Sequence, residues 1–169
     1  MATALAGAGI AVAAGRASHG RATCAHQSIA AFPRAYTNSR NLVIGPLVLV
    51  GARAYSSPET VRRFGGQKYP ALVAAGHTVK VAMSARARKS NALTYADSVH
   101  SSRSVADGLR IVTFQSCSRR DAGSDADGRP VTFWSGGILA SAPRCLRLKI
   151  WVDGASTPRR ARIPIGRRC

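Results

Sequence analysis

Acidic side chains are scarce in this sequence. Its 169 residues include 7 Asp and Glu against 25 Lys and Arg, which gives a formal net charge of +18. The few carboxylates stand almost entirely in turn-like segments, so no paired carboxylates for general acid–base catalysis are found. A surface with so little negative charge attracts polyanions, and this attraction weakens as the salt concentration rises. The coding bias of a GC-rich genome is a competing explanation for the many arginines.

The sequence also lacks a long hydrophobic run. No stretch reaches the roughly 18 apolar residues of a transmembrane helix, so no integral membrane span is expected. The uncharged run Ala2–Ala14 has the length of a signal-peptide apolar region, with cleavage after Ala14 or Ala17, but no basic residue precedes it. The alternative is a disordered leader of an intracellular protein. We expect a leader over residues 1–22, a flexible basic arm over 23–40 and one domain over 41–169.

Motifs for metal or nucleophile chemistry are missing. The four histidines are scattered, and no pair of cysteines has the spacing of a zinc site. Residues 121–128 resemble a calcium loop, but Gly123 and Trp134 stand where that loop needs acidic ligands, so a solvated turn is expected. The sequence therefore yields no catalytic residue, no cofactor site and no metal ligand, and an enzyme is not expected.

The cysteines predict a disulfide framework. Four cysteines in a short chain with an export-like start favour two bridges, and therefore an extracellular or cell-envelope location. Cys117 ends one predicted strand and Cys145 opens another, whereas Cys24 and Cys169 flank the domain. We therefore predict the pairs Cys117–Cys145 and Cys24–Cys169. The alternative is four free thiols in a reducing cytoplasm.

Alternation of apolar and polar side chains predicts β-strands. The clearest case is Leu146–Val152, followed by the hairpin signal Asp153-Gly154 and a second alternating run over 160–165. In Leu42–Val50, Gly45-Pro46 indicates either a bulge or two short strands. Residues 57–65 predict one short helix, with Ser57 as its cap and Gly65 as its end. About seven short strands with one helix predict an all-β, antiparallel sandwich. The predicted strands are 42–50, 77–83, 93–96, 109–117, 131–140, 146–152 and 160–165.

Three segments together resemble a known kind of protein. They are AAGHTVKV (74–81), VADGLRIVTFQSC (105–117) and TFWSGGILASAPRCLRLKIWVDG (132–154). The pattern resembles uncharacterised small exported proteins of actinomycete type and extends over roughly residues 42–169. The resemblance implies an immunoglobulin-like sandwich, and it brings no known activity with it.

Clusters of basic residues are the candidate binding sites. Nucleic-acid-binding sheets usually place exposed aromatic rings among such residues, and Trp134 and Trp151 are the candidates. The alternative is a solvated strand face that the tryptophans cover. The candidate anion-binding residues are Arg86, Arg88, Lys89, Arg147, Lys149, Arg159, Arg160 and Arg162.

These observations favour an exported, non-catalytic β-sandwich protein that binds an anionic polymer or other component of the cell envelope, or a partner protein. An intracellular, basic nucleic-acid-binding module is the alternative.

Overall fold

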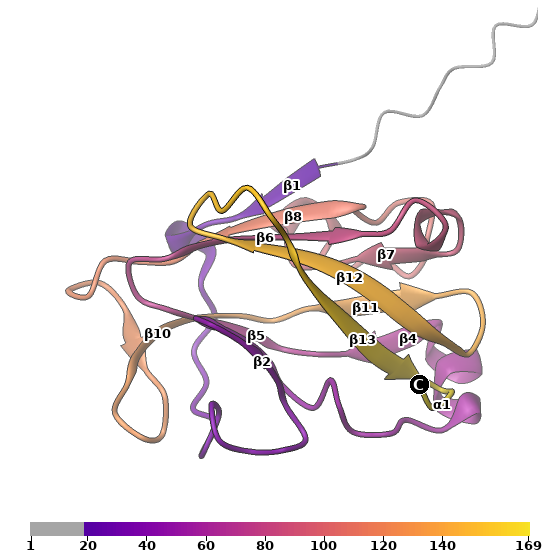
Figure 1. The fold of residues 1–169 in the computed structure, drawn as a ribbon, viewed down its shortest axis with the longest axis horizontal. Coiled ribbons are helices and arrows are strands. Elements are labelled where there is room, and N and C mark those ends of the chain that lie inside the picture. The colour runs from indigo at the N-terminus through magenta and orange to yellow at the C-terminus, as the bar shows by residue number, and fades with distance from the viewer. Residues whose placement is uncertain (1–18) are drawn as a thin grey trace, which may run out of the picture.

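The computed structural model describes residues 19–169 as three β-sheets with one α-helix (Figure 1). Sheet A contains β1 (His19–Ala22), β8 (Ile111–Gln115), β6 (Thr78–Met83), β12 (Arg144–Val152) and β13 (Arg159–Ile165), in that order. Sheet B contains β2 (Leu42–Ile44), β3 (Leu47–Leu49), β5 (Ala71–Ala74), β10 (Pro130–Trp134) and β9 (Gly123–Ser124). Sheet C contains β4 (Gly66–Lys68), β11 (Gly137–Ala140) and β7 (Asn91–Leu93).

The chain is mostly β and its strands pair antiparallel, as predicted, with β1 and β8 as the one parallel strand pair in residues 19–169. The helices are α1 (Pro58–Phe64) and the 3-10 turns η1 (Cys24–His26), η2 (Ala87–Lys89) and η3 (Asp97–Val99). The predicted cap of α1 is confirmed, because Ser57 Oγ accepts a hydrogen bond from Thr60 N and Gly65 ends the helix with a φ of 67°.

Residues 19–169 form 13 strands, where the sequence predicted about seven. Part of the difference comes from predicted strands that divide. Gly45-Pro46 forms a tight turn between β2 and β3, which was the second of the two alternatives for that segment. Gly136 carries the chain from β10 in sheet B to β11 in sheet C, and a side chain there would meet the Tyr95 ring at 2.5 Å. Other strands, such as β4 and β9, are too short to show a period.

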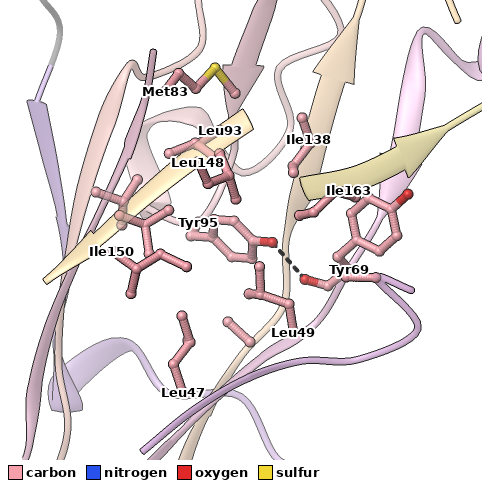
Figure 2. Packing of buried hydrophobic residues seen from close by; sticks show 14 of the residues in the cluster. Leu47, Leu49, Tyr69, Met83, Leu93, Tyr95, Ile138, Leu148, Ile150 and Ile163 are labelled. Carbon is pink, nitrogen blue, oxygen red and sulfur yellow. Dashed lines mark hydrogen bonds between the residues drawn. The ribbon is translucent and has the colours of Figure 1, made fainter. Parts of the chain in front are cut away.

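The inward faces of all three sheets share one hydrophobic core (Figure 2). From β12, Leu148 and Ile150 point into it and meet Leu47 and Leu49 of β3. The Tyr95 hydroxyl lies inside this core and donates a 2.7 Å hydrogen bond to the Tyr69 carbonyl. Burial raises the pKa of Tyr95, so the hydroxyl stays a donor at any neutral pH.

The outward face of sheet B is covered by the segment before β2. Val48, Leu72 and Phe133 lie in one cross-strand row on that face. The Phe32 ring packs on Phe133 at 5.2 Å between ring centroids, and Ala35 is fully buried in the same cluster. These contacts differ from the flexible arm expected over residues 23–40. The segment packs against sheet B because the apolar row there would otherwise be exposed to water.

The start of the expected leader lies outside the described residues, which begin at His19. The last four residues of the expected leader form β1, which pairs with β8 in the register Ala22↔Phe114. Both proposed cleavage points, after Ala14 and after Ala17, precede this strand. No helix in residues 19–169 has both the length and the apolar character needed to cross a membrane.

All four cysteines form disulfides, but the predicted pairing is wrong. The bridges are Cys24–Cys117, with a Cα–Cα distance of 4.8 Å, and Cys145–Cys169, with 5.0 Å. Cys117 follows the end of β8, and the parallel register with β1 brings Cys24 beside it. The strand order explains the error: β8 and β12 both run antiparallel to β6, so the end of β8 and the start of β12 lie at opposite ends of sheet A.

The buried tyrosine gives a test of the core. We expect Tyr95→Phe to destabilise the fold by about 1–3 kcal/mol, because the Tyr69 carbonyl loses its donor in a dry interior. Urea unfolding measures the change. Tyr55→Phe is the matched control, since Tyr55 is 53% exposed and its variant should unfold like the wild type. Equal midpoints for the two variants would show that the buried hydrogen bond contributes nothing.

The disulfides give a second test. Cys24–Cys117 spans 93 residues and Cys145–Cys169 spans 24. Loop-closure entropy predicts losses of about 4–5 kcal/mol for Cys24→Ala/Cys117→Ala and about 3–4 kcal/mol for Cys145→Ala/Cys169→Ala. Guanidinium unfolding of both double variants measures the order. A larger loss from the shorter loop would contradict this account.

Candidate anion-binding face

Basic side chains gather on the outward face of sheet A. Because alternate residues of a strand share a face, the register places Lys149 opposite Arg160 and Arg147 opposite Arg162. A neighbouring row contains Arg21, Thr113, Lys80 and Trp151. All the cations in these rows are exposed. We call this surface the basic face; its cations are Arg21, Lys80, Arg147, Lys149, Arg160 and Arg162.

Negative charge is missing from this surface. The five strands of sheet A contain no Asp or Glu. The described chain has ion pairs only at His26–Asp97 and His77–Asp153, so none of its Lys or Arg side chains is neutralised by a carboxylate within 4.0 Å. Like charges directly opposite each other on neighbouring strands destabilise a sheet. The Arg147–Arg162 and Lys149–Arg160 pairs therefore oppose folding, and an anion between them would relieve that repulsion.

A shallow groove follows these pairs. Its volume is about 360 Å³, and Leu148 and Ala161, whose side chains point into the core, line it between the cations. The remaining lining residues are polar or basic, namely Ser84, Arg147, Lys149, Arg160 and Arg162. Guanidinium groups bind phosphate and carboxylate through paired N–H donors, so the groove suits a repeated oxyanion.

The two tryptophans have different positions. Trp151 is half-buried on the basic face, and Lys80 Nζ lies 4.4 Å from its ring centroid. Trp134 is buried, and its Nε1 donates to the Thr23 carbonyl at 3.0 Å. Trp134 therefore cannot stack on a ligand, and the sequence-based candidate is wrong for it. Trp151 keeps the position that an aromatic contact requires.

The structure divides the predicted anion-binding residues into groups. Arg147, Lys149, Arg160 and Arg162 lie together. Arg86, Arg88 and Lys89 belong to the η2 segment just beyond β6, where Arg88 Nε donates to the Met83 carbonyl at 3.2 Å. That segment follows Ser84, whose backbone N–H donates to the Arg147 carbonyl.

Arg159 does not belong to the basic face. It alternates with Arg160 along β13 and points to the other side of sheet A, with its guanidinium beside Gly45 of the β2–β3 turn. Its place in the basic run 159–162 gave no sign of this, because the sequence alone makes Arg159 part of one cluster.

Arg21 and Lys80 were not among the residues predicted from the sequence. Lys80 alternates with Val79 and Val81, so the period of its own strand put it on a solvent face. Its position beside Trp151 could be predicted only from the order of the strands in sheet A. Arg21 gave no signal, because β1 is four residues long and lies in the segment assigned to the leader.

The carboxylate of Asp153 supports a turn beside this face. Asp153 follows β12, accepts a 2.9 Å hydrogen bond from Thr78 N and a 2.7 Å hydrogen bond from His77 Nδ1. The Thr78 hydrogen bond, followed by that from His77, lowers the pKa of Asp153 below its ordinary value of 3.8. Asp153 therefore stabilises the turn of the hairpin. Its carboxylate pairs with His77 and with no cation of the basic face.

A comparison of this chain with protein-family models, curated proteins and solved structures finds no match.

The pKa of Asp153 predicts how stability depends on pH. A carboxyl whose pKa is lower in the folded state stabilises the fold above its unfolded pKa, and this contribution disappears as pH falls through the folded value. We expect Asp153→Asn to be less stable than the wild type at pH 7, and the gap to narrow at about pH 3, because that pH lies below the ordinary pKa of 3.8 and approaches the lower folded value. Urea unfolding at both pH values measures the gap, and a gap that is the same at both would contradict the assignment.

Proposed function

We propose that this protein is an exported, non-catalytic binding protein that holds an anionic polymer of the cell envelope on its basic face. The single observation that carries the proposal is the set of cations opposite one another on β12 and β13 with no carboxylate among them. The covering of sheet B by residues 28–36 supports the choice of surface, because it leaves the outward face of sheet A as the open one of the two.

Two features support export. Both disulfides are of the kind that persists in oxidising compartments. The apolar run Ala2–Ala14 has signal-peptide length. The mass of the mature chain, with and without reductant, tests the location; an intracellular and fully reduced chain would reject export.

The immunoglobulin-like arrangement is part of the same proposal. Two five-stranded sheets that share a core support it. The parallel β1–β8 pair and the separate sheet C are additions to the simple two-sheet plan.

Single-stranded nucleic acid is the second candidate ligand. Trp151 beside Lys80 favours it, because a partly exposed ring among cations is an arrangement on which bases stack. A wall polymer such as poly(glycerol phosphate) carries the same phosphate charge without bases, so the two ligands separate the contribution of charge from that of stacking.

The binding test uses a charge-neutralising variant of the basic face. We expect the wild type to bind poly(glycerol phosphate) with an affinity that falls steeply with salt. In Arg147→Gln/Lys149→Gln/Arg160→Gln/Arg162→Gln, the slope of log affinity against log salt should fall by roughly 3, at about 0.7–0.9 for each lost phosphate contact. Titration by fluorescence anisotropy at several salt concentrations measures both slopes.

The control variant removes the same charge elsewhere. Arg62→Gln/Arg103→Gln/Arg119→Gln/Arg120→Gln changes exposed residues outside the basic face, and it should bind like the wild type. Equal losses in both variants would show that net charge alone drives binding, against a defined site. If an oligonucleotide of equal charge binds more tightly and Trp151→Ala removes that advantage, the nucleic-acid candidate replaces the envelope polymer.

A further inference from the structure

A second groove lies along the free edge of sheet A. Strand β13 is the last strand of sheet A and β2 is the last strand of sheet B, so each has one unpaired edge. The groove has a volume of about 600 Å³ and takes lining residues from both strands and from the chain terminus. These are Leu42, Ile44, Arg53, Tyr55, Arg160, Ala161, Arg162, Pro164, Arg168 and Cys169.

The backbone of β13 points polar groups into this groove. Both backbone groups of a strand residue point toward the same neighbouring strand, and they alternate along the chain. The Pro164 carbonyl accepts a hydrogen bond from the Tyr69 hydroxyl, and Gly166 N donates to Ser56 Oγ, so these even-numbered residues point away from β12. Arg160 and Arg162 have the same parity. Their N–H and C=O groups therefore face the free edge.

A strand added at this edge would have two different sides. On the outward side its side chains would lie beside the guanidinium groups of Arg160 and Arg162. On the inward side they would lie against Ala161 and against Leu42 and Ile44 of the facing sheet. Alternate acidic and apolar side chains fit this surface, because side chains of an extended chain alternate with a period of two.

The charge of the edge selects among possible strands. A second copy of β13 would bring arginines against arginines, and charged edge residues are a common protection against such self-pairing. An acidic strand would reverse that repulsion. Arg53 and Arg168 also line this groove, and the Arg168 guanidinium lies 5.6 Å from the centroid of the Tyr55 ring. These two residues add further positive charge to the groove.

We propose that the free edge of β13 is a docking site for an extended segment of a partner protein in which acidic and apolar residues alternate. The segment adds to sheet A as a further strand next to Arg160 and Arg162. Its acidic side chains contact those guanidinium groups, and its apolar side chains cover the half-buried Ile44. This site goes beyond the polymer-binding function, since it needs backbone pairing as well as charge.

The experiment uses a synthetic peptide of alternating Glu and Val, blocked at both ends and carrying a fluorophore. Two further peptides are N-methylated. The first is methylated at every Glu amide and the second at every Val amide. In a paired strand only one of these sets of amides points toward β13: the Glu set if the peptide is antiparallel and the Val set if it is parallel. We expect one methylated peptide to lose at least about tenfold in affinity, which is the order of a lost backbone pairing, and the other to bind like the unmodified peptide.

Protein variants locate the binding. Arg160→Gln/Arg162→Gln should weaken the unmodified peptide, and the exposed pair Arg62→Gln/Arg63→Gln on α1 should not. Equal binding of all three peptides would overturn strand addition and leave the polymer-binding proposal intact, because charge alone would then explain the affinity. Failure of the unmodified peptide to bind would also overturn the inference. If the wild type does not bind poly(glycerol phosphate) but the peptides bind as expected, the proposed function is overturned and this docking site stands.

Discussion

The inward packing of Leu146, Leu148 and Ile150 along β12 determines the rest of the surface. With a period of two, burying these residues forces Arg147 and Lys149 outward, and the antiparallel register then places Arg162 and Arg160 opposite them. A shift of the register by one residue would bury the cations and expose the aliphatic side chains, at a cost far larger than the cross-strand repulsion. The core therefore holds like charges together that would otherwise separate.

Two of the few carboxylates, Asp125 and Asp153, hold turns, and neither forms an ion pair with an arginine. Asp125 Oδ1 accepts hydrogen bonds from the backbone of Asp127 and Arg129 in the turn before β10. Asp153 does the same for Thr78 at the end of the β12–β13 hairpin. Hydrogen bonds from backbone N–H groups to a carboxylate are charge-assisted and fix the turn locally. With 7 acidic residues in the chain, such use leaves sheet A without compensating charge.

Local features were predictable, and features that depend on strand order were not. The helix cap at Ser57, the hairpin at Asp153-Gly154 and the alternation of β12 each involve residues close in sequence, so pattern alone identified them. The Cys24–Cys117 bridge, the covering of sheet B by Phe32 and the position of Trp134 all require knowing which strands are neighbours. The candidate site shows the same division: Arg147, Lys149, Arg160 and Arg162 were predicted as clustered basic residues, whereas Arg21 enters only through the β1–β8 pairing.

The two proposed surfaces meet at the same side chains. Arg160 and Arg162 line the groove on the basic face and also the groove at the edge of β13. A guanidinium group that forms paired hydrogen bonds with an oxyanion on one side has fewer donors for a carboxylate on the other. A polymer on the basic face and an acidic strand at the edge would therefore weaken each other's binding, and thermodynamic linkage requires that the factor be the same in both directions. Arg160 and Arg162 are the cations for which the two ligands compete. Each groove also has cations of its own: Arg53 and Arg168 line only the edge groove, and Arg147 and Lys149 line only the groove on the basic face.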